Sequence, residues 1–266
     1  MPCSPGLRPR FFLRMSLLDR FTRKGRKPVK FTRILLKLSG EALMSDGEQY
    51  SHGKLTGLAQ AVAQIVQQGI QVGIVIGAGN IFRARSANLQ IVDRVTADNV
   101  GMLGTVMNAA IMRDYLRAEG LRTKVFSPRE QRPLTKSFAR DDALALMQTG
   151  HVLLFAGGTG NPYFTTDSAA ALRALEISAD ALLKGSQVDG VYDKDPHRHD
   201  DARRYEHLTY GEVIEQRLEV MDLTAVTLCA EQGLPMFVFD ISDPENLVNV
   251  ISGEQPGTWI TKEKQS

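Results

Sequence analysis

Apolar and polar residues alternate along this chain in blocks of two kinds. Short apolar runs, typical of strands buried on both faces, recur at 31–38, 70–76, 124–126, 152–156, 181–184 and 236–239. In the longer blocks between them, apolar residues recur at intervals of three and four, as in Leu55, Leu58, Val62 and Ile65, which predicts helices. We expect helices at 55–66, 94–119, 168–177, 210–215, 223–232 and 244–251.

This alternation indicates the fold class. Strands that alternate with helices pair in parallel and are joined by crossover helices. We therefore predict an α/β fold, a three-layer αβα sandwich with a mostly parallel central sheet. The sequence has no internal repeat and no linker longer than a loop, so residues 31–266 are expected to form a single domain. Within it, the polar stretch 194–205 is expected to be exposed.

The first 30 residues differ from the rest in charge. Residues 1–33 hold ten Lys and Arg and one acid, Asp19, whereas the remaining residues hold 22 basic and 29 acidic side chains. We interpret residues 1–30 as a basic, disordered extension, with a transit peptide or a nucleic-acid-binding arm as alternatives. The acidic body argues against nucleic acid as the main partner.

Cysteine use and hydropathy narrow the class of protein. The only cysteines are Cys3 and Cys229, so we do not expect a disulfide framework. We expect the protein to lie in a reducing compartment such as the cytoplasm. The longest apolar runs, such as 70–76, are too short to span a bilayer, so no membrane partner is expected.

Three turns of small residues, at 37–40, 77–80 and 157–161, follow predicted strands. In an open parallel sheet, ligands bind beyond the carboxyl ends of the strands, and small residues let backbone N–H groups approach phosphate oxygens. The chain lacks Gly-x-x-x-x-Gly-Lys-Ser/Thr and Gly-x-Gly-x-x-Gly, which argues against a P-loop and a dinucleotide site. The turns therefore predict a phosphate site of another kind.

The segment 158–167 carries the most chemistry. It lies between a predicted strand and a predicted helix, so its hydroxyls, amide and backbone N–H groups surround a helix N-terminus, which suits an anionic ligand. Asp167 adds a carboxylate. We expect Lys37, at the end of the first strand, to share one cleft with Asp167.

Six motifs resemble those of one family. The segments 37–43 (KLSGEAL), 76–83 (IGAGNIFR), 101–108 (GMLGTVMN), 158–168 (GTGNPYFTTDS), 188–192 (VDGVY) and 220–223 (VMDL) are similar to those of bacterial uridylate (UMP) kinases, which have the amino-acid-kinase fold. The resemblance runs from about Arg33 to the C-terminus. It implies transfer of the ATP γ-phosphoryl group to UMP with Mg²⁺, a cytoplasmic homohexamer, and GTP and UTP as effectors.

The resemblance also implies a set of site residues. The expected catalytic residues are Lys37, Arg83 and Asp167, and no metal ligand from the protein is expected. The expected ATP-binding residues are Lys37, Leu38, Ser39, Gly40, Gly79, Arg83, Ser186, Tyr192 and Asp195. The expected UMP-binding residues are Ala78, Asp98, Thr159, Gly160, Asn161, Pro162, Tyr163, Phe164, Thr165 and Thr166.

Phosphoryl transfer depends on two phosphates held in line and on neutralised charge. Lys37 would lie over the β- and γ-phosphates, and the planar fork of Arg83 would hold phosphate oxygens. Asp167 would position the lysine or Mg²⁺. It is not expected to act as a base, because the UMP phosphate already carries the attacking oxygen.

Several alternatives stay open. Asp167 and Asp222 could each be only a helix cap, and Tyr192 could belong to the core. His197, His199, Asp200 and Asp201 resemble a metal cluster, although a solvated loop is the simpler interpretation. For the whole chain, the alternatives are an amino-acid-kinase-fold enzyme acting on a carboxylate or carbamate, and a non-catalytic nucleotide-binding protein.

The chain departs from the family at four places. Ala78 replaces the middle of three glycines, which requires a negative φ there, and Ser186 stands where threonine is common. The segments 45–53 and 127–140 also differ from the sequences of the family. The implied response to GTP and UTP is therefore the part of the resemblance with the weakest support.

Overall fold

The computed structural model describes residues 31–45, 47–82, 91–196, 198–254 and 257–263. The expected extension 1–30 and the expected site residue Arg83 lie outside these residues.

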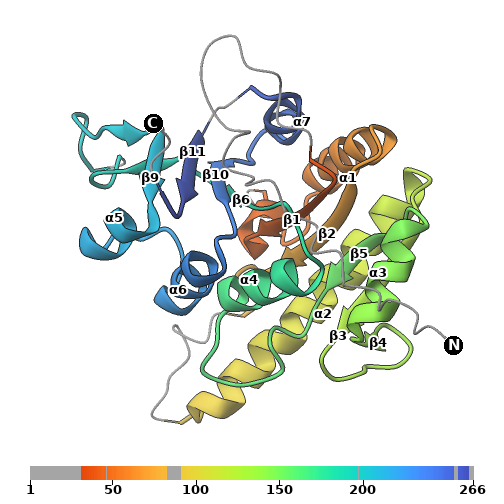
Figure 1. The fold of residues 1–266 in the computed structure, drawn as a ribbon. Coiled ribbons are helices and arrows are strands. Elements are labelled where there is room, and N and C mark those ends of the chain that lie inside the picture. Colours follow the sequence, from red (N-terminus) through yellow and green to blue (C-terminus); the bar gives the residue numbers. More distant parts are fainter. Residues whose placement is uncertain (1–30, 46, 83–90, 197, 255–256, 264–266) are drawn as a thin grey trace, which may run out of the picture.

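The strands of the main sheet run in the order β4-β3-β5-β2-β1-β6-β10-β11-β9 (Figure 1). Every pair in it is parallel except β10 with β11, which confirms the expected, mostly parallel sheet. Its strands are β1 (Arg33–Leu38), β2 (Gln71–Ile76), β3 (Thr123–Ser127), β4 (Lys136–Ser137), β5 (Val152–Phe155), β6 (Ala181–Ser186), β9 (His207–Thr209), β10 (Met236–Asp240) and β11 (Gly257–Thr261). A separate hairpin pairs β7 (Val191–Tyr192) with β8 (Arg204–Tyr205).

Helices cover both faces of the sheet. One hydrophobic cluster joins a face of the sheet to α1 (His52–Gln67), α2 (Arg94–Ala118) and α7 (Glu245–Ser252). A second cluster joins the other face to α3 (Arg140–Gln148), α4 (Thr166–Glu176), α5 (Tyr210–Glu215) and α6 (Leu223–Gln232). The expected three-layer sandwich is therefore confirmed.

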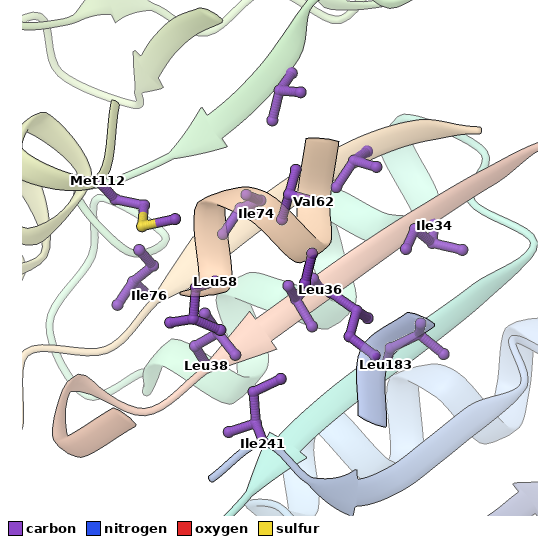
Figure 2. Packing of buried hydrophobic residues seen from close by; sticks show 14 of the residues in the cluster. Ile34, Leu36, Leu38, Leu58, Val62, Ile74, Ile76, Met112, Leu183 and Ile241 are labelled. Atoms are coloured by element: carbon purple, nitrogen blue, oxygen red, sulfur yellow. The ribbon is translucent and has the colours of Figure 1, made fainter. Parts of the chain in front are cut away.

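The central strand β1 shows why its sequence is a continuous apolar run. Ile34, Leu36 and Leu38 point to the α1 side, where they pack with Leu58 and Val62 (Figure 2). Leu35 belongs to the cluster on the α4 side, and Lys37 follows it two residues later on the same side. Because helices cover both faces of this strand, only one polar side chain interrupts the run.

Several elements were not expected from the sequence. They are the 3₁₀ helix η2 (Gly40–Leu43), helix α3, and strands β4, β7, β8, β9 and β11. The apolar residues of helix α3 form one unbroken run at 143–147, which shows no helical period. The two- and three-residue strands are defined by distant partners rather than by local pattern. The described residues of 194–205 are exposed or half-buried, in line with the expectation for this stretch, and strand β8 lies within it.

The parallel pairing brings the three glycine-containing turns to one edge of the sheet. Strands β1 and β2 pair from Arg33 with Gln71 to Leu38 with Ile76, so the turns that follow them start level with each other. Strand β5 continues the same parallel set on the far side of β2. No helix in the described part of the chain is long and apolar enough to cross a membrane.

Candidate active site

The centre of the site is an ion pair between Lys37 and Asp167. Lys37 Nζ lies 2.6 Å from Asp167 Oδ1, and the two side chains are only 10% and 17% exposed. Lys37 comes from the carboxyl end of β1, and Asp167 from the first turn of α4. The structure thus brings together the two residues that the sequence suggested should share a cleft.

The N-terminus of α4 explains how Asp167 is presented. Thr165 is the N-cap, and its Oγ1 accepts hydrogen bonds from the backbone N–H groups of Asp167 at 3.0 Å and Ser168 at 3.4 Å. The capping role therefore belongs to Thr165, so the alternative that Asp167 is only a helix cap is wrong. Its carboxylate stays available for Lys37, at a helix end where negative charge is favourable.

Lys184 is a second lysine of the site that the sequence reasoning missed. It pairs with Lys37 in the register of the parallel strands β1 and β6, and its Nζ lies 4.0 Å from Asp167 Oδ2. The same ammonium group donates a hydrogen bond to the carbonyl of Val220. A signal was present, because the sequences Leu-Leu-Lys-Leu-Ser at 35–39 and Leu-Leu-Lys-Gly-Ser at 182–186 place a lysine at the same point of two strands.

These charges set the protonation of the centre. Burial by itself would raise the pKa of Asp167, but the charges of Lys37 and Lys184 outweigh it and hold that pKa below its ordinary value. Burial, together with the charge of Lys37, lowers the pKa of Lys184, and Asp167 opposes the change. Asp167 is therefore ionised at neutral pH.

Asp222 joins two helix ends beside this centre. It caps α6 by accepting the N–H of Ala225 at 3.0 Å, which is the capping role considered from the sequence. It also accepts hydrogen bonds from the hydroxyls of Thr165 and Ser168. Asp222 therefore does more than cap its own helix, because it fixes the cap of α4 as well.

One pocket lies on the α2 side of the ion pair, with a volume of about 350 Å³; we call it the α2 pocket. Of the residues expected to bind UMP, Ala78, Asp98, Thr159, Phe164, Thr165 and Thr166 line it, and Gly79, expected at ATP, lines it too. Gly160, Asn161, Pro162 and Tyr163 do not, and the side chains of Asn161 and Tyr163 are exposed. The sequence reasoning missed Phe82, Arg94, Gly101, Met102, Thr105 and Gly158 as lining residues.

Asp98 is already engaged within the α2 pocket. Its two carboxylate oxygens accept hydrogen bonds from Arg94 Nε, at 3.0 and 2.9 Å. One of them also accepts a hydrogen bond from the backbone N–H of Tyr163 at 2.8 Å. A ligand hydroxyl at this position would share the carboxylate with these groups.

Ala78 has the negative φ that an alanine at this position in the turn requires. The non-glycine residues with positive φ in the described chain are Tyr163, Ser178 and Arg217.

A second pocket, the β7 pocket, lies by the hairpin and has a volume of about 420 Å³. Ser186, Tyr192 and Asp195, all expected at ATP, line it. The hydroxyl of Tyr192 donates to Asp189 at 2.6 Å, and this hydrogen bond, with burial, raises the pKa of Tyr192. Tyr192 therefore belongs to a pocket wall, and the alternative of a plain core residue is wrong.

A third pocket, the α6 pocket, lies between the other two and measures about 510 Å³. It contains Asp167 and shares Thr165 and Thr166 with the α2 pocket and Glu219 with the β7 pocket. The three pockets thus adjoin in a row, with the lysine–aspartate pair at the middle. Two nucleotides laid end to end, phosphate to phosphate, would need such a row.

The remaining expected residues lie close to this row. The side chain of Leu38 is buried in the core on the α1 side, so only its backbone can face a ligand. Gly40 packs against the turn 77–80, where a Cβ atom on Gly40 would come within 2.7 Å of the backbone nitrogen of Gly79. His197 lies outside the described residues, within which no group of three or more His, Cys, Asp or Glu side chains could hold a metal.

Comparison with known proteins agrees with this architecture. Residues 32–240 match the model of the amino acid kinase family. The uridylate kinase of Xanthomonas oryzae pv. oryzae is 49% identical over 233 residues, which are 87% of this chain and 97% of that protein. The uridylate kinase of a Psychrobacter species is 47% identical over 236 residues, 88% of this chain and 98% of its own length.

Solved structures agree as well. The crystal structure of UMP kinase from Bacillus anthracis superimposes with a TM-score of 0.85 at 36% identity, covering 90% of this chain and 98% of that one. The UMP kinase of Ureaplasma parvum gives a TM-score of 0.83 at 36% identity, covering 87% and 99% of the two chains. The chain belongs to the amino acid kinase family, and its relatives within that family are uridylate kinases.

Proposed function

We propose that this protein is a UMP kinase, which transfers the γ-phosphoryl group of ATP to UMP and yields UDP and ADP. The observation that carries the proposal is the buried Lys37–Asp167 pair, which lies beside three pockets that share lining residues. The names of its relatives, identical at 47–49% of positions over most of the chain, support the same reaction.

In this proposal, ATP occupies the β7 pocket and UMP the α2 pocket, with their phosphates meeting in the α6 pocket. Lys37 follows the negative charge as the phosphoryl group moves, and Lys184 adds a second positive charge 4.0 Å from Asp167. Asp167 holds the ammonium groups in place. It removes no proton, because the attacking oxygen belongs to a phosphate that is already ionised.

Mg²⁺ is the proposed cofactor, and the residues present suit a metal that arrives with ATP. Mg²⁺ in kinases is bound through one or two carboxylates and the substrate phosphates, and the α6 pocket is lined by the carboxylates of Asp167, Glu219 and Asp222. When bound, the ion would neutralise phosphate charge.

A coupled assay of ADP formation with UMP, CMP, dTMP and glutamate tests the proposal. We expect strong turnover with UMP and weak or no turnover with the others, because matched polar groups around a base reject analogues. Strong turnover of glutamate and none of UMP would identify a carboxylate kinase instead. Binding of nucleotides without turnover would identify a non-catalytic protein.

We further propose that the protein acts as a cytoplasmic homohexamer. In support of self-association, Val100, Leu103 and Met107 form an exposed apolar stripe along α2. Such stripes on soluble proteins commonly mark contacts with other chains.

GTP and UTP are the proposed effectors. Burial lowers the pKa of Lys124, the nearby charges of Lys136, Arg117 and Arg113 lower it further, and Glu130 opposes the change. This concentration of positive charge suits a polyanionic effector. Assays with added GTP or UTP test this part of the proposal, which fails if neither changes kcat or KM.

A further inference from the structure

Ala78, which lies between the two glycines of the turn 77–80, packs against helix α2. Its side chain is 7% exposed, and the residue facing it on the helix is Gly104. A Cβ atom placed on Gly104 would lie 2.8 Å from the Cβ of Ala78. Carbon atoms that are not bonded pack at about 3.5–4.0 Å, so the methyl group of Ala78 occupies a notch that only glycine at 104 leaves open.

The backbone conformation of helix α2 does not require a glycine at position 104. It lies in the interior of α2, is buried, and is absent from the residues with positive φ. Glycine destabilises a helix interior relative to alanine. The notch that receives Ala78 supplies the missing reason.

The turn cannot easily move away from α2. On its other side, Gly40 lies so close that a Cβ atom there would come within 2.3 Å of Asn80 Oδ1 and 2.7 Å of the Gly79 nitrogen. Along the helix, the fully buried Asn108 donates to the carbonyl of Gly77 at 2.6 Å and to Asn80 Oδ1 at 2.8 Å. The turn is therefore held between the end of β1 and the face of α2.

The free side of the turn is the α2 pocket, which both Ala78 and Gly79 line together with Thr105 of the helix. Any change in the fit between turn and helix therefore changes the shape of this pocket. The β7 pocket is lined by other residues entirely.

We propose that Ala78 and Gly104 form a size-matched pair that sets the position of the turn 77–80 against helix α2, and that Gly104 is thereby a positioning residue for the phosphate acceptor. This inference rests on the proposed function, in which UMP occupies the α2 pocket. Gly104 touches no substrate in this account and acts through Ala78.

A double-mutant cycle tests the pair with the full-length protein. Gly104→Ala, Ala78→Gly and the double variant are compared with wild type for kcat, for KM of UMP and ATP separately, and for Tm. We expect Gly104→Ala to raise KM for UMP about tenfold or more, since small misplacements in an active site are costly, and to leave KM for ATP nearly unchanged. In the Ala78→Gly background the same substitution should have little effect, because the space for the new methyl is then free.

Gly53→Ala is the matched control, because it makes the same change in helix α1 at a position with nothing within 4 Å. An equal effect of Gly104→Ala in both backgrounds, or an effect on KM for ATP as large as that for UMP, would overturn the inference. So would a rise in Tm with unchanged KM, which is the ordinary result of replacing glycine by alanine in a helix. Wild-type protein that fails to phosphorylate UMP would instead refute the proposed function.

Discussion

The centre of the site consists of three charged side chains that come from three different elements. Lys37 and Lys184 stand side by side on neighbouring strands, and Asp167 faces both from the N-terminus of α4. Two ammonium groups beside the place where the phosphates would meet suit the negative charge of a phosphoryl group in transit.

Replacing Lys37 tests its place at the phosphates. We expect Lys37→Met to lower kcat about a hundredfold or more, the loss typical of one preorganised charge donor, while the protein stays folded. Steady-state kinetics and circular dichroism measure the two effects. A decrease below about tenfold would mean that Lys37 does not contact the transferred group.

Replacing Lys184 tests whether its positive charge lowers the pKa of Asp167. Because its charge helps to keep the pKa of Asp167 low, Lys184→Met should raise that pKa and move the acidic limb of the kcat profile to higher pH. The stability that ionised Asp167 contributes is present above its unfolded pKa, about 3.9, and is lost as pH falls through the lower folded value. In the variant the folded pKa of Asp167 lies closer to the unfolded value, so this loss should be smaller and should be complete at a higher pH, as thermal unfolding against pH measures.

Lys262→Met is the matched control for Lys184→Met, because Lys262 is exposed beyond β11. An acidic limb that stays in place in Lys184→Met would show that Lys184 does not act on Asp167.

At the scale of elements, helix α2 organises one half of the site. Asp98 accepts the N–H of Tyr163, Thr105 accepts the N–H of Gly157 at 2.7 Å, and Asn108 donates to the carbonyl of Gly77. One helix thus fixes two of the three glycine-containing turns and the loop beyond the third. Because α2 is long and regular, it can hold in place turns and loops that form no regular secondary structure.

Asn108 provides a test of this role. Asn108→Asp keeps the shape of the side chain but removes both N–H donors and places a carboxylate oxygen against two carbonyl oxygens. We expect stability to fall by about 1–3 kcal/mol, the usual consequence of unsatisfied buried groups, and KM for UMP to rise more than KM for ATP.

The control for this variant is Asn99→Asp on the same helix. Among the residues that the structure describes, the side chain of Asn99 donates to the carbonyl of Val95, one turn earlier, and it does not line the α2 pocket. Equal changes in the two KM values of Asn108→Asp would contradict a role confined to the α2 pocket.

The extent to which sequence predicts this fold differs between elements. The long helix α2 and the buried strands β1, β2 and β6 carry strong periodic or continuous apolar patterns, so they were predicted closely. Strand β11 was missed because its pairing with the distant strands β10 and β9 defines it. The role of Lys184 was missed for a similar reason, since its register with Lys37 exists only after the sheet forms.

At the scale of the whole molecule, α2 has two faces with different tasks. Asp98, Thr105 and Asn108 contact the site, whereas Leu103 and Met107 are 53% and 50% exposed. An apolar stripe on the outer face of the helix that organises the site would place a neighbouring chain directly behind it.

Charge placed on this stripe tests the proposed self-association. We expect Leu103→Glu combined with Met107→Glu to weaken the oligomer, because two carboxylates would be buried without partners. Sedimentation velocity measures the assembly. Gln60→Glu combined with Gln64→Glu adds the same charge to exposed positions of α1 and should leave it intact. A stripe variant that sediments like wild type would exclude α2 from the contact.

The proposed phosphoryl transfer requires that one cleft receives both nucleotides, with the pair of Lys37 and Asp167 between them. A crystal structure with UMP and a non-hydrolysable ATP analogue measures this most directly. We predict the UMP phosphate beside the turn 77–80 and the γ-phosphate of the analogue within hydrogen-bond distance of Lys37 Nζ. Nucleotides bound elsewhere, with Lys37 and Asp167 beyond the reach of any phosphate, would contradict it.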